Sequence, residues 1–136
     1  HAVIMDPKES VFEEVRHLPE VGVATLKLFM AYKGTAFYCD DEAILSAMMN
    51  AKDAGVTMMV HAENADIITI LTRYYLSQGK TAPVYHYYAR PPIAEEEATG
   101  RAIALAKAAD CPLFVVHVSI RVAMEAIRNA HNDGWP

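Results

Sequence analysis

Lys27, His61 and His117 have side chains suited to metal chemistry, and each is associated with an apolar run. Lys27 lies within one run, whereas His61 and His117 each directly follow another. Imidazole nitrogen is a good ligand for Zn²⁺, Ni²⁺ or Fe²⁺. A lysine amine that burial keeps neutral can react with CO₂, and the resulting carbamate has two oxygens able to bridge two metal ions. Together, these residue types indicate a metal centre.

Each of these residues also has a structural interpretation. A single lysine in a strand can extend its amine to the strand end or pair with a carboxylate. A single histidine after a strand is more often a hydrogen-bonded structural residue than a ligand. The combination favours metal chemistry, because two histidines on separate strands beside an interior lysine form a less common arrangement.

The apolar runs predict strands at Ala2–Met5, Leu26–Met30, Val56–Val60 and Leu113–Val116. In the second strand, side-chain alternation places Lys27 and Phe29 on the same face. Both faces are otherwise apolar, which is typical of a strand covered on both sides in a parallel sheet. Lys27 is therefore predicted to point into a closed interior, where an ammonium must be paired, neutralised or chemically altered.

Capping residues and apolar stripes predict helices between the strands. The expected N-caps are Asp6, Asp40 or Asp41, Asn64 and Ser119, and a further helix is expected from about Ala94 to Ala109. The first three of these capped helices should end before Pro19, at Gly55 and at Gly79. Lys80–Ile93 is predicted to be a loop, and its length indicates a functional or subunit-contact role.

The order of these elements is strand–helix repeated along the chain, with one insertion of double length. This order predicts an α/β fold with a parallel sheet, either an open doubly wound sheet or part of a TIM (β/α)₈ barrel. In both folds the chemistry lies at the C-terminal ends of the strands, where His61 and His117 are placed. The sequence contains neither GxGxxG nor GxxxxGK[ST], which disfavours nucleotide-binding versions of the fold.

Composition excludes several classes of partner. The chain has 136 residues, of which 53% are hydrophobic, a net charge of −5 and no basic run. Nucleic acid and anionic membranes are therefore not expected partners. No apolar stretch approaches the length of a membrane span. The two cysteines, Cys39 and Cys111, form no CxxC pair, which favours a reducing, cytoplasmic location.

Several segments resemble the dihydropyrimidinase and hydantoinase family of the amidohydrolase superfamily. The segment LKLFMAYK at 26–33 resembles the lysine strand of that family, and VHAEN at 60–64 and VVHVS at 115–119 resemble its next two metal-site strands. YARPP at 88–92, followed by Glu95, Glu97 and Arg101, resembles the connection between them. The resemblance covers nearly the whole chain in the order of the family.

The resemblance implies a role for each site residue. Lys27 would be carboxylated and bridge two divalent metal ions, expected to be Zn²⁺, and His61 and His117 would bind one of them. A metal-bridging hydroxide would open the ring of a cyclic amide such as a dihydropyrimidine or hydantoin. The Tyr32 hydroxyl would stabilise the oxyanion. Phe29 would shape the substrate pocket, although ordinary core packing explains it about as well.

The family pattern also includes residues that this sequence lacks. A His-x-His pair on a first strand and an aspartate on a late strand do not occur here. The resemblance therefore implies that residues 1–136 are the central portion of a barrel domain, incomplete at both ends and inactive alone. A homo-oligomer, expected to be a tetramer, is implied for the full-length protein.

Three alternatives remain at the level of sequence. Allantoinase and dihydroorotase belong to the same superfamily, although the tyrosine at position 32 favours the dihydropyrimidinase pattern. Non-catalytic scaffold relatives have lost metal ligands, and the presence of Lys27, His61 and His117 argues against that class. The third alternative, an α/β domain with coincidental histidines, is disfavoured by the order of the motifs.

Overall fold

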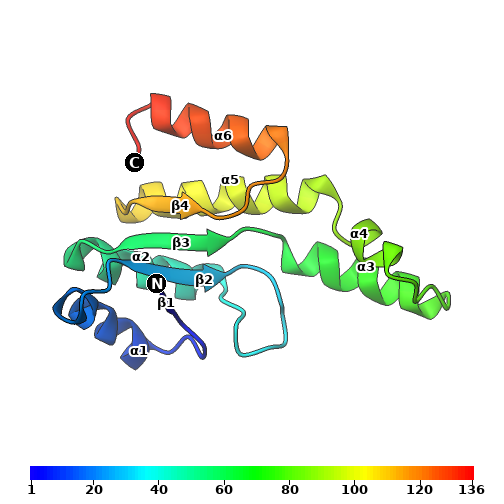
Figure 1. Ribbon diagram of the computed structural model, residues 1–136, viewed down its shortest axis with the longest axis horizontal. Coiled ribbons are helices and arrows are strands. Elements are labelled where there is room, and N and C mark those ends of the chain that lie inside the picture. The colour runs from blue at the N-terminus through cyan, green and yellow to red at the C-terminus, as the bar shows by residue number, and fades with distance from the viewer.

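The computed structural model describes all residues 1–136 and contains one four-stranded sheet, with strand order β1-β2-β3-β4 (Figure 1). The strands are β1 (Ala2–Val3), β2 (Thr25–Phe29), β3 (Thr57–His61) and β4 (Leu113–Val115). All three neighbouring pairs are parallel. The predicted parallel sheet is confirmed, and its C-terminal ends meet at one edge.

Helices separate the strands. The chain forms α1 (Glu9–Glu14), the 3-10 helix η1 (Val15–Val21), α2 (Asp41–Ala54), α3 (Ala65–Ser77), α4 (Val84–Tyr88), α5 (Pro92–Ala109) and α6 (Arg121–Asn132). Helices α2 and α5 lie behind the sheet in Figure 1 and pack on each other, and α6 packs on α5. The pair α3 and α4 instead projects beyond the C-terminal ends of the strands.

One face of the sheet carries the hydrophobic core. Leu26 and Leu28 of β2, with Met58 and Val60 of β3, are fully buried against the helices. The opposite face is more exposed: Lys27 is half-buried, and Phe114 of β4 is 57% exposed. The prediction that Lys27 lies in a closed interior is therefore wrong for this chain, because helices cover only the other face of its strand.

Several predicted helix ends are confirmed. The Asp40 carboxylate accepts a hydrogen bond from the backbone N–H of Ala43 at 2.9 Å, as an N-cap does. The Asn64 side chain accepts from the N–H groups of Asp66 and Ile67, each at 3.0 Å. Gly55 terminates α2 with φ of 68°, a left-handed conformation that glycine adopts without steric cost.

Two predicted caps are wrong. Asp6 does not cap α1, which has Lys8 as its N-cap; Asp6 instead forms an ion pair with Lys8 at 2.6 Å. Its backbone has φ of 82°, and its N–H donates to Ala36, so a contact distant in sequence fixes this residue. Ser119 does not cap α6 either, since Ile120 occupies that position and the hydroxyl of Ser119 donates to Glu95.

The predicted loop Lys80–Ile93 is partly helical. It contains α4, and α5 begins at Pro92, earlier than the sequence indicated. Tyr75 of α3 packs near Tyr85 of α4, with ring centroids 5.3 Å apart. This aromatic contact between the two projecting helices explains why a segment rich in proline and tyrosine is ordered as a helix.

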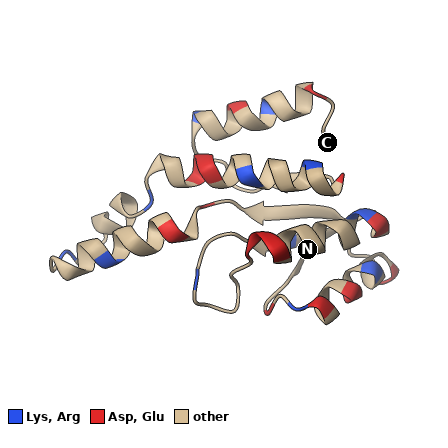
Figure 2. Cartoon of the chain, turned by 180° about the vertical axis from the view of Figure 1, so that it is seen from behind, with Lys and Arg blue, Asp and Glu red and all other residues tan.

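Charged side chains of both signs are distributed over the helices. Figure 2 shows Lys and Arg interspersed with Asp and Glu, and no helix carries Lys or Arg without Asp or Glu. A membrane-crossing helix is absent, because no helix combines the length and apolar character that a bilayer span requires.

Candidate active site

The two strand-end histidines face each other. His61 is the last residue of β3, and its Nδ1 lies 2.9 Å from Nε2 of His117, which follows β4. The ring centroids are 4.6 Å apart with an interplanar angle of 69°. Just before them, the N–H of Val116 donates to Val60 at 3.1 Å and holds the two strands together. The parallel register thus brings together two residues that are far apart in sequence.

The facing nitrogens have a separation close to that of two ligands on one small cation. In a tetrahedral zinc site with Zn–N bonds of about 2.05 Å, two nitrogens are about 3.3 Å apart. A separation of 2.9 Å therefore requires only a small movement of the rings to admit an ion. No group of three or more His, Cys, Asp and Glu side chains is arranged to hold a metal in this chain. The two facing histidines alone fall short of such a group.

Glu63 contacts His61, and Arg90 in turn contacts Glu63. The Oε2 atom of Glu63 is 2.7 Å from Nε2 of His61, and its Oε1 atom is 3.5 Å from Nε of Arg90. All three side chains are largely shielded from solvent. The hydrogen bond with His61 holds the pKa of Glu63 below its ordinary value, and this effect outweighs the opposing effect of burial. Glu63 is therefore a carboxylate at neutral pH.

Aromatic side chains form a wall beside the histidines. The ring of Tyr32 is 5.3 Å and that of Phe29 is 5.8 Å from the ring of His61, measured between centroids. Tyr32 has φ of 66°, and its carbonyl accepts hydrogen bonds from the N–H and hydroxyl of Thr35. This turn directs the phenol toward the histidines while leaving the residue 42% exposed.

A cavity of about 340 Å³ opens at this edge of the sheet. Tyr32, His61 and His117 line it, together with Glu63, Arg90 and others. Lys27 and Phe29 do not line this cavity. In the register, Phe29 pairs with His61 and Lys27 pairs with Met59. Lys27 therefore lies on the same face of the sheet as His61, two residues further from the C-terminal ends of the strands. Its amine is 4.9 Å from the centre of the Phe29 ring.

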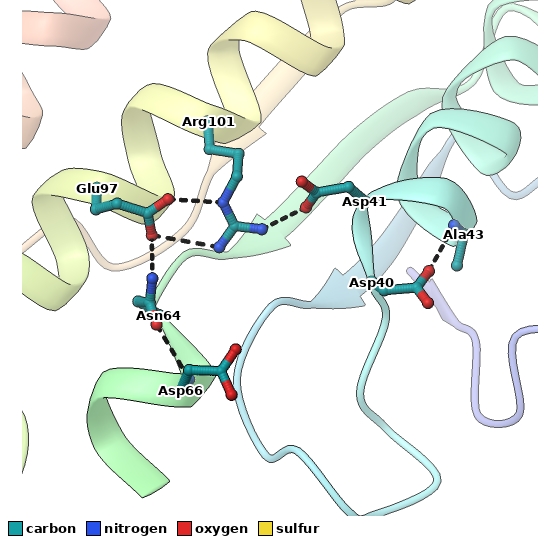
Figure 3. A network of polar contacts seen from close by, with 7 residues as sticks. All are labelled: Asp40, Asp41, Ala43, Asn64, Asp66, Glu97 and Arg101. Carbon is teal, nitrogen blue, oxygen red and sulfur yellow. Dashed lines mark hydrogen bonds and ion pairs between the residues drawn. The ribbon is translucent and has the colours of Figure 1, made fainter. Parts of the chain in front are cut away.

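A polar network fixes the loop that follows His61 (Figure 3). The Asn64 amide donates to Glu97, and Arg101 donates from Nε to the same carboxylate at 2.8 Å. Arg101 also pairs with Asp41 at the start of α2. The end of β3 is thereby attached to both helices that cover the sheet, which restricts where His61 can move.

A second carboxylate fixes the loop that follows His117. Glu95 of α5 accepts hydrogen bonds from the N–H of Ser119 at 2.7 Å, from the Ser119 hydroxyl and from the N–H of Ile120 at 3.3 Å. His117 itself has φ of 41°, a conformation that is rare for residues other than glycine. Glu95 therefore holds a turn that the local sequence does not favour.

Sequence reasoning did not assign roles to Glu63, Arg90 or Glu95. One local signal was present for the neighbouring network, because Glu97 and Arg101 have the i,i+4 spacing of a helical ion pair. The contacts of Glu63 with Arg90 and of Glu95 with Ser119 cross between elements, and no spacing rule predicts them.

Comparison with known proteins places these features in a family. No family model matches the chain. The chain is 41% identical over 134 residues to a D-hydantoinase of Ralstonia pickettii and 37% identical over 135 residues to a dihydropyrimidinase of Rattus norvegicus, with 98% of the chain covered in each case. Its fold matches a crystal structure of dihydropyrimidinase from Brevibacillus agri with a TM-score of 0.94 and 45% identity over 99% of the chain.

The chain belongs to the D-hydantoinase and dihydropyrimidinase family and corresponds to a segment of its members. It spans 29% of the length of the Ralstonia relative, 26% of the rat relative and 29% of the Brevibacillus structure. The similarity to hydantoinases, which are TIM-barrel amidohydrolases, identifies the four strands as part of a (β/α)₈ barrel rather than an open doubly wound sheet. The resemblance inferred from the three motifs is confirmed.

Proposed function

We propose that the full-length protein containing this segment hydrolyses cyclic amides of the dihydropyrimidine and hydantoin type. The observation that carries the proposal is the convergence of His61 and His117 beside Tyr32 at the C-terminal edge of the sheet. The relatives named D-hydantoinase and dihydropyrimidinase support the substrate class. Allantoinase or dihydroorotase activity remains the alternative within the superfamily, and a non-catalytic scaffold is the alternative outside it.

The proposed site would hold two divalent metal ions, expected to be Zn²⁺. His61 and His117 would bind one ion, and Lys27, carboxylated on its amine, would bridge both. The donor set supports this proposal, because the two imidazoles already face each other and Lys27 extends from the same sheet face one layer below. When bound, the metal ions would supply Lewis acidity and a nucleophile at neutral pH.

The residues of this chain would then bind and orient the substrate. The cavity beside the histidines receives the ring, and the Tyr32 hydroxyl donates a hydrogen bond to the oxygen on which negative charge develops. The ring of Phe29 packs against the ring of Tyr32, with centroids 5.8 Å apart, and supports the aromatic wall beside the histidines. In this proposal Phe29 acts on the substrate pocket through Tyr32, since it does not line the cavity itself.

The test is metal content and hydrolysis in the full-length protein. Lys27→Ala and His61→Ala should each lose most bound metal and nearly all hydrolysis of a dihydropyrimidine and a hydantoin. Added short-chain carboxylates should restore part of the bound metal and part of the hydrolysis in Lys27→Ala, by replacing the bridging oxygens. Lys27→Arg should not recover either, because a guanidinium remains charged and has no acceptor oxygen.

His17→Ala is the matched control, because His17 is exposed on η1 and remote from the strand ends. Full metal occupancy and normal hydrolysis in Lys27→Ala would assign Lys27 to a structural role. Preferential turnover of allantoin or dihydroorotate would favour the alternative enzymes. No turnover of any cyclic amide by a metal-loaded wild type would favour the scaffold.

We also propose a homo-oligomer, expected to be a tetramer, in the cytoplasm. The projecting pair α3 and α4 supports assembly, since it exposes large apolar side chains such as Ile70 and Tyr87, which are 61% and 69% exposed. The free thiols of Cys39 and Cys111 support a reducing compartment. Sedimentation of the full-length protein and its cellular fractionation test these two proposals.

A further inference from the structure

Both ring nitrogens of His61 have a partner, and the two partners differ in chemistry. Nε2 is 2.7 Å from a carboxylate oxygen of Glu63, and Nδ1 is 2.9 Å from Nε2 of His117. A carboxylate only accepts hydrogen bonds, so the proton of a neutral His61 must be on Nε2. This tautomer leaves the lone pair of Nδ1 directed at His117, toward the point where a shared cation would bind.

The contact with Glu63 also selects between two orientations of the ring. A half-turn of the imidazole about its Cβ–Cγ bond exchanges Nδ1 with Cδ2 and Nε2 with Cε1. In the turned orientation a carbon would face His117 and a carbon would face Glu63. The hydrogen bond to Glu63 is lost in that orientation, so Glu63 favours the one that presents Nδ1 to the cavity.

Arg90 in turn holds Glu63. The carboxylate divides its oxygens between the two neighbours, with Oε2 on His61 and Oε1 at 3.5 Å from Nε of Arg90. Arg90 follows α4 and directly precedes Pro91, the N-cap of α5, and Pro92, its first residue. Nη1 of Arg90 also lies 3.2 Å from Nδ1 of His86. Pro91 and Pro92 restrict the backbone after Arg90, and the contacts with Glu63 and His86 fix its guanidinium. The guanidinium compensates the charge of the Glu63 carboxylate, which is largely shielded from solvent.

We propose that Glu63, held in place by Arg90, is a positioning residue that sets the tautomer and ring orientation of His61. The proposal rests on the proposed function only where it adds that the positioned Nδ1 binds metal. Carboxylates that accept a hydrogen bond from a ligating histidine fix its tautomer and raise its basicity, and their loss commonly weakens metal binding by about 10–100-fold. No residue spacing shows this role, because Arg90 reaches Glu63 only through the fold.

The first measurement is the tautomer of His61, read from ¹⁵N-histidine NMR spectra of the 136-residue chain without metal. The wild type should show one Nε2–H tautomer at neutral pH. Glu63→Leu should give a mixture of tautomers and ring orientations. Glu63→Gln preserves the shape and can still offer its carbonyl, so it should lie between the two and remains informative if the leucine variant does not fold.

Glu20→Gln is a matched control, because Glu20 makes the same type of contact with His17, at 3.1 Å, on the exposed surface. It should leave His61 unchanged. Arg90→Met should shift the tautomer population of His61 in the same direction as Glu63→Gln. An unchanged His61 tautomer and ring orientation in both Glu63 variants would overturn the proposal. A doubly protonated His61 in the wild type at neutral pH would also overturn it, because no tautomer would then be selected.

The second measurement is Zn²⁺ affinity of the full-length protein, determined by competition with a chromogenic chelator. Glu63→Leu should bind Zn²⁺ about 10–100-fold more weakly, and Glu20→Gln should match the wild type. Unchanged affinity in Glu63→Leu would overturn the link to metal binding. A wild type that binds no Zn²⁺ but shows the Glu63-dependent tautomer would refute the proposed function while supporting the positioning role.

Discussion

Asn64 offers a quantitative test of how the end of β3 is held. Its side-chain oxygen caps α3 by accepting from the N–H groups of Asp66 and Ile67, and its amide donates to Glu97. Loss of a cap of this kind costs about 1 kcal/mol. The contact with Glu97 adds about 0.5–1 kcal/mol, a reduced figure because that carboxylate is partly exposed and keeps Arg101.

Asn64→Ala should therefore lower the free energy of unfolding of the 136-residue chain by about 1.5–2 kcal/mol. For a chain of this size, that corresponds to a decrease in Tm of roughly 5–9 °C. Asn64→Ser should lose only about half as much, because a serine hydroxyl caps well but is too short to reach Glu97. Urea and thermal unfolding followed by circular dichroism measure both.

Two outcomes would refute this reasoning. A loss below about 0.5 kcal/mol in Asn64→Ala would show that neither contact stabilises the chain, since that is the scatter of ordinary surface substitutions. Equal losses in Asn64→Ala and Asn64→Ser would show that the contact with Glu97 contributes nothing, and that the network in Figure 3 does not restrain the loop.

Three further predictions concern other parts of the chain. In the full-length protein, Tyr32→Phe should lower kcat by about ten- to a thousandfold at unchanged metal content, and unchanged turnover would assign Tyr32 to packing. Burial raises the pKa of Cys111 to about 11 and also raises that of Cys39, so both thiols should resist iodoacetamide at pH 8 until urea unfolds the chain, as mass spectrometry would show. Partial burial opposes ionisation of Glu97, but hydrogen bonds from Arg101 and Asn64 hold its pKa below the ordinary value. Its contribution to stability should be complete above the unfolded pKa of about 4.3 and be lost as the pH falls through the lower folded pKa. Urea unfolding should show Glu97→Gln less stable than the wild type at pH 7, and the difference should disappear once the pH is below the folded pKa.

Local sequence determined the elements whose signals are local. Apolar runs predicted the strands, and Asp40, Asn64 and Gly55 marked helix ends because capping and left-handed turns depend on a few adjacent residues. The strand–helix order was enough to predict a parallel sheet, and the motifs placed His61 and His117 at its C-terminal edge. The same local rules failed at Asp6 and Ser119.

Tertiary structure decided the rest through contacts between segments that are far apart in sequence. Ser119 carries the signature of a cap, yet its hydroxyl and N–H bond to Glu95 because α5 starts beside the end of β4. Lys27 carries the pattern of a strand covered on both sides, yet it is half-buried in these 136 residues, which span about 29% of the length of the Ralstonia relative and cover only one face of the sheet with helices. The 2.9 Å approach of His61 to His117 depends on the register that pairs Val60 with Val115 and on the turn at His117, where φ is 41°. Backbone hydrogen bonds between β3 and β4 set that register, and no spacing within either strand encodes it.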